Sequence, residues 1–106
     1  MSIDDWRRRI DEIDKRLLLL LNERARCALE IGHEKEKSGL PIYQPEREVE
    51  ILTKVEASNP GPLSHSAVRR LFERIIDEAR SLERSARDSK ARDASREKTE
   101  NAPREK

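Results

Sequence analysis

The first part of the chain carries apolar side chains at intervals of three and four residues, or of seven where one position is skipped. These positions are Ile3, Trp6, Ile10, Ile13, Leu17, Leu20, Cys27 and Ile31. Such spacing forms one apolar stripe along an α-helix, and residues 4–38 contain no proline and a single glycine, Gly32. The pattern therefore predicts one helix, about 50 Å long at a rise of 1.5 Å per residue. Ser38, Gly39 and Pro41 are expected to end it.

A second, shorter helix is predicted from about Pro45 to Ser58. Its apolar anchors are Val49, Ile51, Leu52 and Val55. Pro45 suits the first helical position because it has no backbone N–H to leave unpaired. Glu46 and Glu48 are favourable near the positive N-terminal end of a helix. The sequence NPGP at residues 59–62 ends this helix.

A third helix is predicted to begin near Ser64 or Ser66, because serine is a common helix cap, and to end around Ser85. Its apolar positions at helical spacing are Val68, Leu71, Phe72, Ile75, Ile76, Ala79 and Leu82. Residues 86–106 contain no large apolar side chain. Such a segment cannot bury enough apolar surface to offset the entropy of ordering it. We therefore expect a helical domain over residues 1–85 and a disordered, charged tail over residues 86–106, which the domain does not need.

The composition of this all-α chain leaves few apolar residues for a hydrophobic core. Of 106 residues, 42% are charged and 34% are hydrophobic, and the aromatic residues are only Trp6, Tyr43 and Phe72. A 50 Å helix with one apolar side is longer than a small monomeric domain needs, so we expect an oligomer. The single Cys27 provides neither a disulfide framework nor a zinc site, and its place in a helical pattern predicts a packing role.

Charge and hydropathy exclude two classes of partner. Lys and Arg number 23 and Asp and Glu 22, a formal net charge of +1, so the chain has no broad basic field for nucleic acid or an anionic membrane. The five leucines at residues 17–21 are too few to span a bilayer, and no long apolar run follows the charged N-terminal segment. We expect a cytoplasmic protein.

Two cations interrupt the apolar stripe of the first helix. Arg24 and Lys35 lie 11 residues apart, almost three whole turns, so they project from one face. Buried cations are rarely tolerated without an anion; glutamates of the fold, outward extension to solvent, or a bound anion would each satisfy them. Arg7 faces the same side but lies 17 residues from Arg24, about 25 Å at 1.5 Å per residue. A two-fold dimer with antiparallel long helices would bring Arg7 of one chain near Arg24 of the other.

Several segments together resemble one family. They are WRRRIDEIDKRLLLLLNER, IGHEK, PIYQPERE and LFERII, all between residue 3 and about residue 84. In this combination the chain resembles the all-helical AroQ-type chorismate mutases. The resemblance implies three helices per chain, an intertwined homodimer with two active sites, and conversion of chorismate to prephenate for phenylalanine and tyrosine biosynthesis, without metal or cofactor. The segment NPGPL is similar to mutase domains fused to the first enzyme of the shikimate pathway, so another enzyme of that pathway is an expected partner.

The resemblance also assigns the cations of the site. Arg24, together with Arg7 of the partner subunit, would hold the two substrate carboxylates, a task that suits the planar guanidinium fork. Lys35 would point at the ether oxygen and a carboxylate. The rearrangement needs no nucleophile, so the protein would act by positioning the substrate and stabilising negative charge on that oxygen.

The loop and the first turn of the second helix would form one wall of the site. By the resemblance, Glu48 accepts a hydrogen bond from the ring hydroxyl and Arg47 lines the same wall. Ile31 and Ile76 would supply apolar walls. Gln44 stands where the best-known bacterial pattern has aspartate, but an amide can also bond a hydroxyl.

Glu83 is a second departure, because that pattern has glutamine there and serine at Ala79. Other family members carry glutamate at this point. An ionised carboxylate has no proton to donate, so Glu83 would serve the ether oxygen only when protonated. Three other readings stay open at this level: a purely structural helical dimer, a regulatory mutase-like subunit that docks on another shikimate-pathway enzyme, and an isochorismate pyruvate-lyase.

Overall fold

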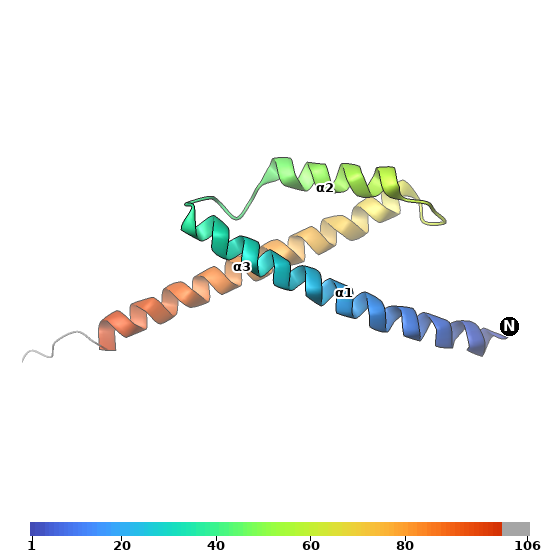
Figure 1. Cartoon of the computed structure of the whole chain (residues 1–106), viewed down its shortest axis with the longest axis horizontal. Helices are drawn as coiled ribbons and strands as arrows, with labels where there is room; N and C mark the ends of the chain where they lie inside the picture. Colours follow the sequence, from blue (N-terminus) through green and yellow to red (C-terminus); the bar gives the residue numbers. More distant parts are fainter. Residues whose placement is uncertain (101–106) are drawn as a thin grey trace, which may run out of the picture.

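The computed structural model describes the backbone of residues 1–100 and the side chains of residues 1–95. Over this range the chain forms three helices, α1 (Ile3–Lys37), α2 (Pro45–Ser58) and α3 (His65–Glu100), and no strand. Helix α3 crosses the C-terminal half of α1 and runs alongside α2 (Figure 1). Among the described residues α3 packs against both other helices, whereas α1 and α2 do not pack against each other. The all-α, three-helix prediction is confirmed.

Both ends of α1 are closed by local hydrogen bonds. Ser2 and Asp5 form a capping box at the start, and hydrogen bonds from the Ser2 backbone, the Ser2 hydroxyl and Arg8 lower the pKa of Asp5 below its ordinary value. At the other end, Leu40 N donates to Lys35 O at 2.7 Å and Gly39 N donates to Glu36 O at 3.2 Å. Gly39 has φ of +68°, which favours glycine, so this end is a Schellman motif. It turns the chain directly after Lys35.

The other two helices also begin as the sequence predicts. Pro45 occupies the first turn of α2, and Glu46 and Glu48 follow it. The Ser64 hydroxyl accepts a hydrogen bond from Ala67 N at 3.1 Å, so Ser64 rather than Ser66 provides the cap of α3. These starts fix which side chains of α2 and α3 face α1.

The core of the single chain is small. Its buried apolar residues are Ala28, Leu52, Val68 and Ile76, and no described side chain is fully buried. The apolar stripe on the first half of α1 has no cover within the chain, because Trp6 is 53% exposed and Leu20 62% exposed. Cys27 is exposed as well, so its predicted packing role was wrong for one chain taken alone.

The predicted end of the third helix near Ser85 was wrong. Helix α3 continues to Glu100, so the chain has two long helices and one short helix, and the predicted disorder was wrong over residues 86–100. Residues 86–95 contain neither glycine nor proline and are rich in alanine, arginine and lysine, which favour helix. Arg87 also donates to Gly32 O at 3.4 Å, and Lys90 lies 3.9 Å from a Glu36 carboxylate oxygen. The part of the predicted tail at 101–106 lies outside the described residues.

The hydropathy prediction concerns these same helices. Within the described residues, none of them has an apolar stretch long enough to cross a membrane.

Candidate active site

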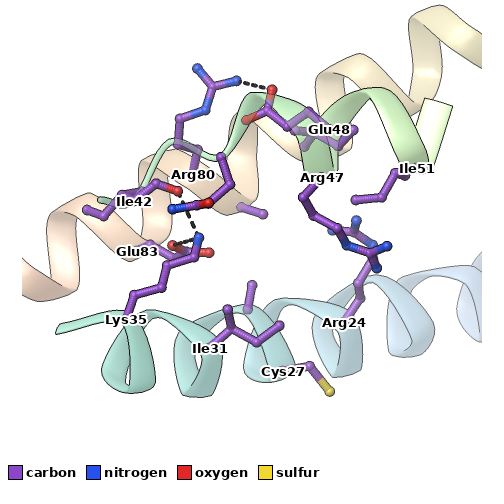
Figure 2. A pocket seen from close by; sticks show the side chains of 14 residues that line it. Arg24, Cys27, Ile31, Lys35, Ile42, Arg47, Glu48, Ile51, Arg80 and Glu83 are labelled. Carbon is purple, nitrogen blue, oxygen red and sulfur yellow. Dashed lines mark hydrogen bonds and ion pairs between the residues drawn. The ribbon is translucent and has the colours of Figure 1, made fainter. Parts of the chain in front are cut away.

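A pocket of about 480 Å³ lies between α1, the loop that follows it, the first turns of α2, and α3 (Figure 2). Its lining combines cations, two glutamates and apolar side chains: Arg24, Cys27, Ala28, Ile31, Lys35, Ile42, Gln44, Arg47, Glu48, Ile51, Ile76, Ala79, Arg80 and Glu83. Every site residue predicted from the sequence lines this pocket except Arg7. The space exists because α3 holds α1 and α2 apart.

Two arginines form one end of the pocket. Arg24 comes from α1 and Arg47 from α2, and Figure 2 shows their side chains directed toward each other across the cavity. Arg47 donates to Glu50 on its own helix at 2.7 Å, whereas Arg24 has no ion pair with any described residue. Two neighbouring guanidinium groups repel each other, so this end of the pocket favours an anion between them.

Lys35 lies at the opposite end and connects three parts of the chain. Its Nζ donates to Ile42 O in the loop at 2.8 Å and to Glu83 Oε2 on α3 at 3.2 Å. The side chains of Lys35 and Glu83 are only 15% and 8% exposed. A cation and a carboxylate held this close and this far from water keep a fixed geometry, because breaking the contact would leave a buried charge unpaired. Of the three ways of satisfying the stripe cations that the sequence left open, pairing with a glutamate of the fold is the one observed for Lys35.

The close approach of α1 and α3 beside this pair depends on a glycine. A Cβ atom built on Gly32 would lie 3.2 Å from Glu83 Cγ, closer than most carbon pairs come. Glycine therefore lets the Glu83 side chain pack directly on the α1 backbone. This contact directs the carboxylate toward Lys35 and the pocket.

Glu48 and Gln44 line the wall formed by the loop and α2. Glu48 Oε1 accepts a hydrogen bond from Arg80 on α3 at 2.8 Å. The Gln44 side chain turns back to its own loop, where Nε2 donates to Pro41 O at 2.9 Å. The amide nitrogen of Gln44 is thus already engaged, while its carbonyl oxygen makes no hydrogen bond to the described residues. Glu48 is the anionic acceptor of this wall.

Apolar side chains close the remaining sides. Ile76 on α3 is buried, and Ile31 on α1 is 53% exposed at the pocket mouth. Between the charged ends the cavity therefore offers an apolar surface to the body of a ligand.

Arg7 is the one predicted site residue that the chain does not bring to the pocket. It lies on the first turns of α1, its side chain is 73% exposed, and its nearest carboxylate oxygen is that of Asp4 at 3.8 Å. A straight helix separates it from Arg24 by about 25 Å.

Arg80 is the principal pocket residue that the sequence reasoning missed. A signal was present, because Ile76, Ala79, Arg80 and Glu83 recur at intervals of three, four and seven, and therefore share one face of α3. Arg80 therefore shares this face with the apolar residues and with Glu83, although the apolar pattern alone does not include it.

The contacts of the pocket indicate the kind of ligand that it can hold. Four cations, Arg24, Lys35, Arg47 and Arg80, line a small apolar cavity, and two of them, Lys35 and Arg80, are paired with the two glutamates. Such a site suits a compact ligand with more than one negative group and a hydrogen-bonding substituent. It can hold that ligand in one conformation and stabilise charge that develops near Lys35.

Comparison with known proteins identifies the family. Residues 6–84 match the model of the family described as chorismate mutase type II. The chain belongs to this family. Among solved structures, one similar protein is the chorismate mutase (form II) of Thermus thermophilus. The two share 39% identity with a TM-score of 0.76, over 77% of this chain and 93% of the Thermus chain.

Curated relatives place the same domain in longer proteins. The bifunctional chorismate mutase/prephenate dehydratase of Neisseria gonorrhoeae is 44% identical over 78 residues, which are 74% of this chain and 21% of the relative. The bifunctional protein of Aquifex aeolicus is 40% identical over 87 residues, 78% of this chain and 24% of the relative. This type II chorismate mutase family member therefore spans about a fifth to a quarter of the length of these relatives.

Proposed function

We propose that this chain is a chorismate mutase, which rearranges chorismate to prephenate in phenylalanine and tyrosine biosynthesis. The observation that carries the proposal is the pocket in which Arg24, Arg47 and Lys35 face one apolar cavity. Membership of the type II family and the likeness to the Thermus enzyme over 93% of its length support it. A cytoplasmic location and a partner enzyme of the shikimate pathway stay predictions.

The reaction requires no nucleophile from the protein. Chorismate carries two carboxylates, and in its rearrangement one carbon–oxygen bond breaks while one carbon–carbon bond forms within the same molecule. The ether oxygen becomes more negative as its bond to carbon breaks. A protein accelerates such a step by holding the reactive conformer and by placing donors at that oxygen.

The roles proposed for the pocket residues come from the family resemblance, and the positions of their side chains around the cavity support them. Arg24 binds a carboxylate at the arginine end, with Arg47 on the same wall. Lys35 lies at the other end, where its ammonium group serves the ether oxygen and a carboxylate. Ile31 and Ile76 hold the ring between them.

The remaining two roles fall to side chains of the opposite walls. Glu48 accepts a hydrogen bond from the ring hydroxyl, and the carbonyl oxygen of Gln44 is a second acceptor on the same wall. Glu83, 3.2 Å from Lys35, reaches the ether oxygen as a donor when it carries a proton.

The family resemblance assigns the second carboxylate to an arginine of another subunit. We propose an intertwined homodimer in which Arg7 of the partner subunit completes each site. The uncovered apolar stripe on the first half of α1 supports it, as does an apolar groove of about 410 Å³ between α1 and α3 that includes Leu21, Ile75 and Leu82. Sedimentation of the pure protein should give about twice the chain mass of 12.4 kDa.

A mixing experiment tests whether Arg7 acts across the dimer. An Arg7→Ala chain and a Lys35→Ala chain should each be nearly inactive alone. In a mixed dimer, one site contains both changes and the other contains neither, so mixing should restore activity. Absence of recovery after verified subunit exchange would contradict the shared site.

Substrate assays test the proposed function itself. The purified protein is incubated with chorismate and, separately, with isochorismate, and the loss of substrate absorbance is followed. Turnover of chorismate alone is expected. Turnover of isochorismate instead would indicate a pyruvate-lyase, and turnover of neither would favour the regulatory subunit.

A further inference from the structure

Arg80 forms a short ion pair across two helices at the pocket wall. Its Nη2 atom on α3 donates to Glu48 Oε1 on α2 at 2.8 Å and to Asp77 Oδ1 on α3 at 3.1 Å. The Arg80 and Glu48 side chains are 28% and 22% exposed, whereas the other ion pair between α2 and α3 in the described residues, Arg69 with Glu56, is 3.5 Å long and 50% and 31% exposed. The tighter and less exposed of the two pairs is the one at the pocket.

Further contacts fix the Arg80 guanidinium in place. Its central carbon lies 4.9 Å from the centroid of the Tyr43 ring, so the loop between α1 and α2 stacks on it. Its Nε is buried and has no hydrogen-bond partner among the described residues, so the side chain holds Glu48 without satisfying all its own donors. Such a pair adds little to stability compared with an apolar contact. Its effect is to define where Glu48 lies.

The position of the Glu48 carboxylate depends on Arg80, because no other residue in the described part of the chain pairs with it. Among the described residues, α1 and α2 do not pack against each other, and Arg80 is the sole side-chain partner of Glu48. Figure 2 shows the Glu48 carboxylate turned toward Arg80. The bond occupies Oε1 and leaves Oε2 as an acceptor. The amide nitrogen of Gln44, the neighbouring polar side chain of this wall, already donates a hydrogen bond to Pro41 O at 2.9 Å.

We propose that Arg80 is a positioning residue that holds the Glu48 carboxylate for the ring hydroxyl of the substrate. This inference rests on the proposed chorismate mutase function and deepens it. Without Arg80, the Glu48 side chain gains rotameric freedom and the hydroxyl acceptor is no longer preorganised. Arg80 therefore contributes to the recognition of a hydroxylated ring, and it acts through Glu48.

The test compares two substrates, chorismate and a chorismate analogue that lacks the ring hydroxyl. The variants are Arg80→Met, which removes the charge, and Arg80→Lys, which keeps a donor able to reach toward Glu48. Arg69→Met is the matched control, because it removes an arginine of α3 that also pairs with a glutamate of α2, but outside the pocket. Helix content and melting temperature are recorded for each variant.

Arg80→Met is expected to lower kcat/KM for chorismate by about tenfold to a hundredfold, the range for a misplaced binding group. It should leave kcat/KM for the analogue nearly unchanged, and Arg80→Lys should recover part of the loss. In a Glu48→Ala background, Arg80→Met should have little further effect, because both changes remove one interaction. Arg69→Met should behave as wild type with both substrates.

Equal losses on both substrates, or no loss on either, would overturn the inference while leaving the proposed function intact. If Arg80→Met does not fold, the same comparison with Arg80→Lys decides, since a selective loss on chorismate supports the inference and an equal loss on both substrates refutes it. Wild-type protein that turns over neither substrate would refute the proposed function, and the inference with it.

Discussion

Replacing Gly32 with alanine changes the contact between α1 and α3 beside the proposed catalytic pair. The new Cβ would lie 3.2 Å from Glu83 Cγ, 3.5 Å from its Cβ and 3.6 Å from its Cδ. Carbon atoms rest about 3.5–4.0 Å apart, so the first contact is several tenths of an ångström too short. The Glu83 side chain must shift away from α1, and its Oε2 contact with Lys35, now 3.2 Å, must change with it.

The size of the effect differs between stability and turnover. Alanine is better than glycine inside a helix by about 1 kcal/mol, and overpacking costs about 1–3 kcal/mol, so the net loss of folding free energy is at most about 2 kcal/mol. A misplacement of 1 Å can cost about a hundredfold in rate. If the logarithm of the loss in rate is proportional to the displacement, a shift of about 0.3–0.5 Å lowers kcat by roughly four- to tenfold.

Steady-state kinetics with chorismate and thermal melts followed by circular dichroism measure the two effects. Gly39→Ala is the matched control, because a Cβ there meets no atom within 4 Å but the backbone has φ of +68°. It should cost about 1–2 kcal/mol of folding free energy through backbone strain. We expect Gly32→Ala to lose mainly kcat and Gly39→Ala to lose mainly melting temperature. Full kcat in a folded Gly32→Ala protein would refute the role given to this contact.

Three further predictions concern the same end of the pocket. Lys35→Ala should lose about 2.7–4 kcal/mol of transition-state stabilisation, mostly in kcat, as for other oxyanion donors; near-normal turnover would contradict its role. Glu83→Gln should keep or raise kcat, because the amide nitrogen can donate a hydrogen bond to the ether oxygen; steady-state kinetics with chorismate check this, and a large loss of kcat would exclude a donor role at this position. A chain ending at Ser85 lacks the contacts of Arg87 and Lys90 with α1, so its melting temperature should fall, and unchanged melting would show that the extension adds nothing.

The sequence was sufficient where the signal is local. The end of α1 and both ends of α2 follow from Gly39, Pro45 and the NPGP segment, because these residues restrict the backbone whatever surrounds them. Arg24 and Lys35 could be assigned to one face of α1 from spacing alone, and both line the pocket. Helical periodicity and turn-forming residues act within a few positions of the chain, so they can be recognised from the sequence alone.

Features that depend on contacts between helices could not be read in this way. The extension of α3 beyond Ser85 shows no apolar pattern, and its contacts with α1 use Arg87 and Lys90, whose partners are 55 and 54 residues earlier in the chain. The pairing of Arg80 with Glu48 spans 32 residues. Polar contacts at such separations carry no periodic signature, because one partner constrains neither the identity nor the spacing of the other.

The central claim is that the chain converts chorismate to prephenate in the pocket that contains Lys35. Nuclear magnetic resonance of chorismate incubated with the pure protein follows substrate and products together, with Lys35→Ala and Arg69→Met run in parallel. We expect prephenate to appear in step with the loss of chorismate, without pyruvate and far faster than in buffer, and we expect Lys35→Ala but not Arg69→Met to lower this rate by about a hundredfold to a thousandfold. Chorismate lost no faster than in buffer, release of pyruvate, or full activity in Lys35→Ala would contradict this claim.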